Sequence, residues 1–476
     1  MQSTKDPKSP HTITKVGVTS DTLTGRAGLN LFVRYLDNIG INPLLHQLFG
    51  RLRKSRKRLP IVEIFKQIFV FLLDGTSRHL SYFDALKKDP AHAGIVESSQ
   101  QRLLSSHAVK RFFKAFSLPV IHFFRKLLRE LFVWRLRLAA PDRVVLSLDS
   151  MVMDNDEAAK RHGVTPTYKK VKGFQPLQLA WQRYIIDAVF RRGDRHCNYG
   201  NDAVRMIRQA VATIRTYYRA DVPILIRMDS GFFDEEIFAA CEELGIGYVC
   251  GGRLYDDIRD RARDRPKKGW EVFDRKPQQW RYFEFEDQRE AWSRSRRAIF
   301  CQPLYEDRQR LLKFARPDTV IYTNLGQGQE IDDLLLRADH ANMLDAATLI
   351  GFYHRRGADE LVHRELKDFA SEQLPFLRFG PNMAYYFTTL VAFFLFEAFK
   401  EDVSCEVIPL ESYPTTVRRQ LFDQAGKIVR HAGEVALKVT QALWDQLKLS
   451  VLWQKAHTPP QINPLVLLLE PKNRSI

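Results

Sequence analysis

The chain contains little cysteine, and its cysteines are not arranged to bind metal or to form a disulfide framework. Its 476 residues include five of them, with no Cys-x2-Cys pair and no zinc-ligand spacing. We therefore expect reduced thiols that are buried or idle, as in a cytoplasmic protein. The five are Cys197, Cys241, Cys250, Cys301 and Cys405.

Signals for export and for a membrane span are also missing. Residues 1–20 are polar and carry lysines without an apolar core, so they predict a disordered tail and not a secretory signal. The apolar run Met383–Phe396 is shorter than the ~20 residues that a bilayer span needs, and Glu397 ends it. We expect a buried core helix here and no membrane partner. The chain also shows no Gly-rich phosphate loop, no Ser/His/Asp ordering, no repeat and no low-complexity tract.

Positive charge exceeds negative charge by a wide margin. The chain has 73 Lys and Arg against 56 Asp and Glu, a net charge of +17, and its pI is near 9.6. This excess indicates a polyanionic partner, DNA before others. Charge alone leaves a basic housekeeping or RNA-binding protein open.

Two short apolar runs end on an aspartate. Val144–Leu148 leads to Asp149, and Val222–Met228 leads to Asp229. Both runs predict buried strands. Ligand sites collect outside the carboxyl ends of parallel strands, so the two acids are expected to converge. The alternative is that each Asp is a turn former or a helix N-cap, which is the usual role of a single Asp at such a place.

Four polar residues downstream share a helical spacing. Taking Tyr353 as zero, Arg356, Glu360 and Lys367 fall at +3, +7 and +14. At about 100° per residue, one continuous helix would carry all four on a narrow stripe. A carboxylate among a hydroxyl, a guanidinium and an ammonium suits metal binding and phosphate contact. A solvated helix face with ion pairs four residues apart is the alternative.

Glu365 is the rival acid in this segment. On the same helix it falls on an arc that faces the core, so Glu360 is the preferred metal ligand. The other residues of that arc are Leu361, Val362, Leu366 and Phe369. Two strand-end aspartates and Glu360 would make an all-oxygen site for a divalent ion, and Mg²⁺ suits such a site. The pattern predicts a phosphoryl-transfer site.

These residues resemble the DDE transposases of bacterial insertion sequences. The branch is marked by a Tyr-x2-Arg-x3-Glu-x6-Lys box, which Tyr353, Arg356, Glu360 and Lys367 match without a departure, and the chain is most similar to the group called "IS thirteen-eighty". The resemblance spans about Leu146–Phe399. Further matching pieces follow in order: Leu148-Asp149-Ser150, Lys172–Leu177, Arg227–Phe232 and Tyr322-Thr323-Asn324.

The resemblance implies an α/β fold with an RNase H-like catalytic core. Asp149, Asp229 and Glu360 would bind two Mg²⁺ ions, for which Mn²⁺ can substitute, and the box residues Tyr353, Arg356 and Lys367 would contact DNA phosphates. It also implies cleavage at the element's terminal inverted repeats and transfer of the 3′-hydroxyls into target DNA, by a homodimer on DNA. A domesticated or inactive DNA-binding relative, or a stand-alone nuclease of the same fold, would share these features.

Spacing and texture predict the domain order. We expect a helical DNA-binding region over 21–140, and over 141–254 the first part of the core, in the order βββαβαβ. The gap of 360 − 229 = 131 residues between the last two acids is too long for one connection and predicts a β-rich insertion over 255–325. The final helices, with Glu360, fill 326–400, and a helical C-terminal region with an irregular tail fills 401–476.

Two further features leave alternatives open. Leu104–Phe116 resembles the capped second helix of a helix-turn-helix unit, with a basic run at Arg51–Lys57 upstream, or it is an ordinary amphipathic helix. Trp270, Trp280 and Trp292 of the insertion would either stack on an unpaired base or pack in the core.

Overall fold

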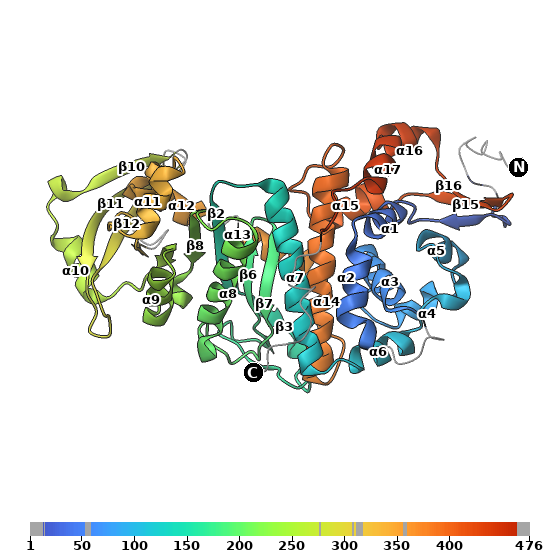
Figure 1. Ribbon diagram of the computed structural model, residues 1–476, viewed down its shortest axis with the longest axis horizontal. Coiled ribbons are helices and arrows are strands. Elements are labelled where there is room, and N and C mark those ends of the chain that lie inside the picture. Colours follow the sequence, from blue (N-terminus) through green and yellow to red (C-terminus); the bar gives the residue numbers. More distant parts are fainter. Residues whose placement is uncertain are drawn as a thin grey trace, which may run out of the picture.

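The computed structural model describes residues 13, 15–52, 59–275, 278–306, 309–310, 318–355 and 359–463. It is a mixed α/β protein in which a large sheet lies at one end and a bundle of helices at the other (Figure 1). Two long helices, α7 (Leu118–Ala139) and α14 (Phe379–Phe399), run side by side between the two ends. Residues 1–12 and most of the basic run at 51–57 lie outside the described residues.

The large sheet is mixed. Its order is β10-β11-β12-β14-β9-β8-β2-β6-β7, with β2, β8 and β9 parallel to one another and the other neighbours antiparallel. Its strands are β2 (Val144–Ser150), β6 (Leu177–Trp181), β7 (Tyr184–Val189), β8 (Ile224–Met228), β9 (Gly247–Gly251), β10 (Glu271–Arg275), β11 (Gln278–Asp287), β12 (Arg296–Glu306) and β14 (Thr319–Thr323), with β13 (Gln309–Arg310) paired to β12.

The predicted order βββαβαβ is confirmed. Strands β2, β6 and β7 are followed by α8 (Asp202–Tyr217), β8, α9 (Glu235–Glu243) and β9. The Asp234 carboxylate accepts a hydrogen bond from the Glu236 amide and so caps α9. A small separate sheet lies along the chain between β2 and β6. It consists of β3 (Met153–Asp154), β5 (Lys172–Phe174) and β4 (Thr165–Pro166) in that order.

The strands predicted after residue 255 are confirmed, and they extend the core sheet. Helix α10 (Asp256–Asp264) leads to the β10–β11–β12 meander, and β14 returns to pair with β9. The described strands of this segment therefore belong to the same sheet as β2 and β8. The interpretation of its tryptophans as packing residues is favoured: Trp280 is buried and stacks on His354 and Phe273, and Trp292 packs against Phe233.

The region before α7 is mostly helical, as predicted. The Ser105 side chain accepts a hydrogen bond from the Ala108 amide, so the predicted cap of the 104–116 helix is present. The residues directly before this helix are a 3-10 turn, Gln100–Arg102, and the non-helical residues 103–105. A first helix joined to it by a short turn, as in a helix-turn-helix unit, is therefore not present in this described stretch. The elements are β1 (Thr22–Thr24), α1 (Leu29–Asn38), α2 (Ile41–Phe49), α3 (Ile61–Asp74), α4 (Tyr82–Leu86), α5 (Pro90–Ile95) and α6 (Ser106–Lys114).

The C-terminal region predicted to be helical also contains two strands. Strands β15 (Gly426–His431) and β16 (Glu434–Lys438) form a hairpin, and β15 pairs with β1 near the start of the chain. Ala432 and Gly433 both have positive φ, as a tight two-residue hairpin turn requires. The short helix α15 (Pro414–Val417) comes before the hairpin, and α16 (Gln441–Gln446) and α17 (Leu449–His457) come after it.

The apolar run at 383–396 forms part of α14, the predicted core helix. The segment 379–404 is long and apolar enough to cross a membrane, but 94% of its most apolar window is buried. Its aromatic side chains contact both ends of the molecule: Phe394 lies 4.5 Å from the Tyr184 ring of β7, and Phe399 meets Phe32 of α1 edge-on. The helix therefore joins the sheet to the helical bundle, and it gives no indication of a membrane.

An ion pair is buried at the end of α14. The Lys400 ammonium lies 2.9 Å from the Glu397 carboxylate, and both side chains are almost fully excluded from solvent. Burial raises the pKa of Glu397 to about 7, against the pull of Lys400. Since this pKa is higher in the folded chain than in the unfolded one, the contribution of Glu397 to stability is lost as the pH rises through about 7.

Replacing Lys400 by Met is expected to lower the free energy of unfolding by about 3–5 kcal/mol at pH 8, because the buried Glu397 carboxylate loses its nearer partner and keeps only the weaker contact with the Arg183 guanidinium at 3.8 Å. At pH 6 the loss should be smaller, since Glu397 then takes up a proton and carries no charge. Denaturant unfolding at the two pH values measures both losses. The double variant Glu397→Gln/Lys400→Met should recover most of the stability; equal losses at pH 6 and pH 8 would contradict this account.

Candidate active site at the ends of strands β2 and β8

The two predicted strand-end acids lie next to each other. Strands β2 and β8 are parallel neighbours, and Leu148 is paired with Met228. Asp149 and Asp229 are the residues that follow this pair, so their backbones are separated by about one strand spacing, ~4.8 Å. Strand β8 is fully buried and β2 alternates between buried and half-buried residues, whereas Asp149 and Asp229 are both partly exposed. The sheet thus brings two carboxylates together at its surface.

Local hydrogen bonds hold each carboxylate. One Asp149 oxygen accepts from the Ser150 amide at 2.7 Å. One Asp229 oxygen accepts from the Gly231 amide at 2.9 Å and caps the short 3-10 helix Ser230–Phe232. Asp229 is therefore also a capping residue, as the alternative interpretation expected. Capping and a place in the site are compatible, because the cap uses only one of its two oxygens.

Cys197 lies against both acids. Its sulfur is 4.0 Å from the Ser150 hydroxyl, and a Cβ added to Gly231 would lie 2.8 Å from that sulfur and 2.9 Å from the Asp229 carboxylate. Burial, together with the charges of Asp229 and Asp149, raises the pKa of the Cys197 thiol. The sulfur of Cys197 therefore lies close to Ser150 and Gly231, which follow the two acids along the chain.

The segment that carries the predicted stripe is not one helix. Helix α12 (Ala346–His354) ends one residue after Tyr353, and α13 (Asp359–Phe369) carries Glu360 and Lys367. The angular argument across all four residues was therefore wrong, since it needs unbroken helical phase. It holds only within α13. Arg356 lies outside the described residues, and for Glu360 the structure describes the helix position and not the side chain.

Tyr353 still reaches the site from α12. A Cβ added to Gly251, the last residue of β9, would overlap the Tyr353 hydroxyl and lie 3.1 Å from the Ser230 amide nitrogen. The phenol therefore packs against the end of β9, beside the residue that follows Asp229. Arg227 holds α12 in this place by donating to the Phe352 carbonyl at 3.0 Å.

Lys367 lies on the other side, near the chain that leaves β2. Its ammonium donates to the Val152 carbonyl at 3.0 Å and to Glu372 at 2.9 Å. A third of the side chain remains exposed. Lys367 therefore keeps α13 close to the segment that follows Asp149.

Within α13, the predicted preference between the two glutamates agrees with burial. Glu365 is buried, and burial raises its pKa. Val362, Leu366 and Phe369 are buried with it, whereas Leu361, which was expected on the same arc, is 40% exposed. Glu365 thus faces the core and not the strand ends.

One residue near the acids was missed by sequence reasoning. His363 of α13 lies with its Nε2 atom 3.4 Å from the second Asp149 oxygen. Its position three residues after Glu360 and four before Lys367 is the helical spacing of a shared face, and that spacing was the available signal. The face of α13 that carries His363 and Lys367 therefore lies over the end of β2.

Side chains from distant segments fix α13. The Asp368 carboxylate accepts from the Thr415 amide and hydroxyl at 2.7 and 2.6 Å. Arg418 donates to the Phe369 carbonyl at 2.6 Å and to the Leu72 carbonyl at the end of α3 at 2.9 Å. The helix is thereby anchored to the helical bundle at the end opposite Glu360.

A family model described as transposase DDE domain group 1 matches residues 10–456. The chain belongs to this family. It is a DNA transposase, an enzyme that cleaves DNA and transfers its strands during transposition, as the sequence predicted. The paired carboxylates at the ends of β2 and β8 agree with membership in this family.

Other comparisons add little to this assignment. No curated protein matches the chain. Among solved structures, the piggyBac transposase synaptic complex with hairpin DNA matches at 12% identity and a TM-score of 0.40, over 91% of this chain and 82% of that one. A likeness at this level carries no argument about how the transposase works.

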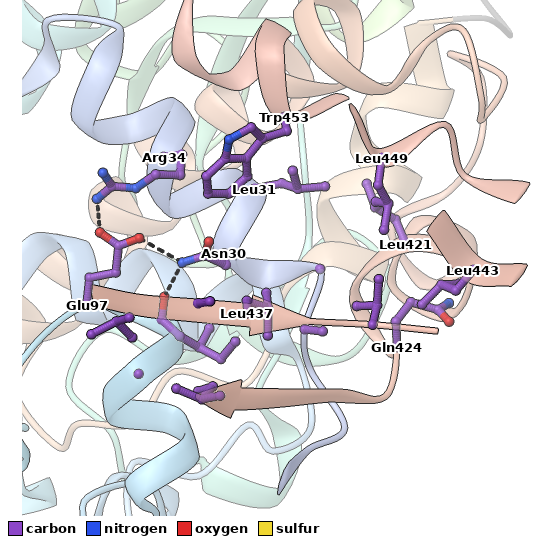
Figure 2. Close-up of a pocket in the computed structure, with 18 of the residues that line it drawn as sticks. Asn30, Leu31, Arg34, Glu97, Leu421, Gln424, Leu437, Leu443, Leu449 and Trp453 are labelled. Atoms are coloured by element: carbon purple, nitrogen blue, oxygen red, sulfur yellow. Dashed lines mark hydrogen bonds and ion pairs between the residues drawn. The ribbon is translucent and has the colours of Figure 1, made fainter. Parts of the chain in front are cut away.

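The transposase also has a cavity of about 910 Å³ (Figure 2). It lies between α1, the β15–β16 hairpin and α17, and apolar side chains such as Leu31, Leu437 and Trp453 line it. Asn30 and Arg34 meet Glu97 at its polar edge. None of the predicted site residues lines this cavity, so it is separate from the candidate active site at the ends of β2 and β8.

Proposed function

We propose that Asp149, Asp229 and Glu360 form the metal-binding triad of an insertion-sequence transposase. The pairing of Leu148 with Met228 carries this proposal, because it sets the two aspartates side by side at the carboxyl ends of parallel strands. Helix α13 supplies the third acid from its first turn. The contact of His363 with Asp149 supports this arrangement, since it puts the following turn of α13 directly over β2.

We further propose that the core is RNase H-like. Its order β7-β6-β2-β8-β9, with two antiparallel and two parallel pairings and α8 and α9 as crossovers, supports this class. The acids on β2 and β8 then belong to adjacent central strands. The segment 255–325 would be an insertion that lengthens the sheet beyond β9.

The donor set fits Mg²⁺, with Mn²⁺ as a substitute. Carboxylate oxygens are hard ligands, and each aspartate has one oxygen held by a main-chain amide, so its orientation is restricted before an ion binds. Among the described side chains no group of three metal-binding residues is present, and the described set does not include the side chain of Glu360. Two bound ions would supply an activated oxygen nucleophile and stabilise the leaving oxygen.

The remaining box residues would hold the DNA backbone at the cut. Tyr353 offers a hydroxyl beside Ser230, and an ammonium has three donors, of which Lys367 uses two on Val152 and Glu372. Arg356 would add a bidentate guanidinium contact. No protein nucleophile is needed: water attacks first, and the released 3′-hydroxyl then attacks the target phosphodiester.

The substrate would be the terminal inverted repeats of the element and a target DNA. The net charge of +17 supports a polyanionic partner, and the helical region 21–140 would supply part of the binding surface. Joining two ends in one reaction calls for a homodimer on DNA. The transposase would act in the bacterial cytoplasm on the nucleoid.

Cleavage of DNA that carries the element's own terminal repeats tests this function. Purified transposase with Mg²⁺ is expected to release element ends with free 3′-hydroxyls and to join them to a second DNA. A chelator should stop both steps, and added Mn²⁺ should restore them. Cleavage that ignores the repeats, with no joined product, would instead indicate a stand-alone nuclease; DNA binding without cleavage would indicate an inactive relative.

A further inference from the structure

His363 makes a contact with Asp149 that the proposed triad does not explain. Its Nε2 atom is 3.4 Å from an Asp149 oxygen, and its side chain is only 13% exposed. The other Asp149 oxygen accepts a hydrogen bond from the Ser150 amide. The carboxylate is therefore held from both sides, once by its own strand and once by α13.

A carboxylate at the end of a strand needs such contacts to keep one orientation. The terminal torsion of Asp is broad and roughly two-fold, so the backbone alone does not decide where the oxygens point. The Ser150 amide fixes one oxygen, and His363 limits rotation of the other. Groups that orient a metal ligand from behind generally raise metal affinity without touching the ion.

The second nitrogen of His363 makes no polar contact with the described residues. Its Nδ1 atom is buried and has no hydrogen-bond partner among the described residues. Histidines that serve the fold usually have both nitrogens satisfied, because a buried unpaired polar atom is costly. The described polar contact of the His363 ring is thus directed at Asp149.

We propose that His363 is a positioning residue, which holds the Asp149 carboxylate in the orientation that binds the metal. This inference rests on the proposed role of Asp149 as a metal ligand. His363 itself contacts neither the ion nor the DNA. Its effect is expected in the metal dependence of cleavage, while DNA affinity stays unchanged.

The chain offers a matched control. His340 lies 3.1 Å from Asp142, another His–Asp contact, but Asp142 precedes β2, whereas Asp149 lies at the carboxyl end of that strand. The same substitution at His340 therefore removes the same kind of contact from the opposite end of one strand. It should leave the metal dependence as it is in the parent protein.

The test is a Mg²⁺ titration of end cleavage by full-length variants. His363→Leu removes the contact and is expected to need about 10–100-fold more Mg²⁺ for half-maximal cleavage, the usual cost of losing an orienting partner. Saturating Mg²⁺ should recover most of the rate. His340→Leu should titrate like the parent, and metal-free DNA affinity should be the same for all three proteins.

Two amide variants guard against a folding defect in His363→Leu. His363→Gln places an N–H donor near the position of Nε2, whereas His363→Asn places it near Nδ1, out of reach of Asp149. The proposal requires the His363→Gln variant to reach half-maximal cleavage at a lower Mg²⁺ concentration than the His363→Asn variant. Equal midpoints for Gln and Asn, or a parent-like midpoint for His363→Leu, would overturn it, as would a loss confined to DNA affinity.

Asp149→Asn in the same assay separates this inference from the proposed function. If Asp149→Asn still cuts, Asp149 is not a metal ligand and the triad fails. If Asp149→Asn is inactive while His363→Leu titrates like the parent, the triad stands and only the positioning role is lost.

Discussion

Replacing Asp149 or Asp229 by Asn is expected to lower the rate of end cleavage by about 1,000-fold or more. An amide keeps the size of the side chain and the cap on the Gly231 amide, but it removes a charged metal ligand. A metal-bound transition state is stabilised by several kcal/mol, and about 4 kcal/mol corresponds to a factor of 1,000 in rate. The Glu360→Gln substitution should lower the rate of end cleavage by a similar factor. Single-turnover cleavage at saturating Mg²⁺ measures the effect.

Glu365→Gln is the matched control for Glu360→Gln. It makes the same chemical change five residues further along α13, on a buried side chain whose pKa burial raises. Neutralising it should spare both cleavage and DNA affinity. Cleavage that survives in Glu360→Gln and fails in Glu365→Gln would mean that α13 presents its other face to the strand ends.

DNA affinity is expected to fall by about 10³–10⁵-fold between 50 and 200 mM salt, which is the loss for a protein that neutralises 6–10 phosphates. Helix α6 is proposed to make some of these contacts. Its buried side carries Val109, Phe112 and Phe113, and its exposed side carries three basic residues. These three are Lys110, Arg111 and Lys114.

Replacing these three by Ala should make the plot of log affinity against log salt less steep by about 3, since each phosphate contact adds about 0.9 to the slope. The control removes the same charge from α10, whose basic side chains stand among acidic ones; its residues are Arg259, Arg261 and Arg263. Titrations of a labelled terminal repeat at several salt concentrations give the slopes. An equal change in both variants would show that α6 contributes only net charge.

Local patterns were enough to predict the elements that carry the acids. Short apolar β-branched runs predicted β2 and β8 and placed Asp149 and Asp229 at their ends, because the pattern that indicates a strand lies in consecutive residues. The apolar run in α14 was recognised for the same reason. The β15–β16 hairpin was not predicted; it depends on the turn at Ala432-Gly433, where both residues have positive φ, and on the pairing of β15 with β1 from the start of the chain.

The family's motifs were also legible in the sequence, and membership in the DDE transposases is confirmed. The assignment of roles to Asp149, Asp229 and Glu360 remains a proposal. The continuous helix assumed from Tyr353 to Lys367 was wrong, because spacing along the chain reports helical phase only where the helix is unbroken. Helix α12 ends at His354 and α13 begins at Asp359, so the helical phase of Tyr353 does not predict that of Glu360.

The sequence by itself therefore determined which residues end the strands, which helix face of α13 is apolar, and which family the chain resembles. Only the tertiary structure decided which of these residues meet. The pairing of β2 with β8 brings together acids that are 229 − 149 = 80 residues apart, and the packing of α13 brings His363 to Asp149 across 363 − 149 = 214 residues. Such contacts depend on how whole elements pack, which no local periodicity specifies.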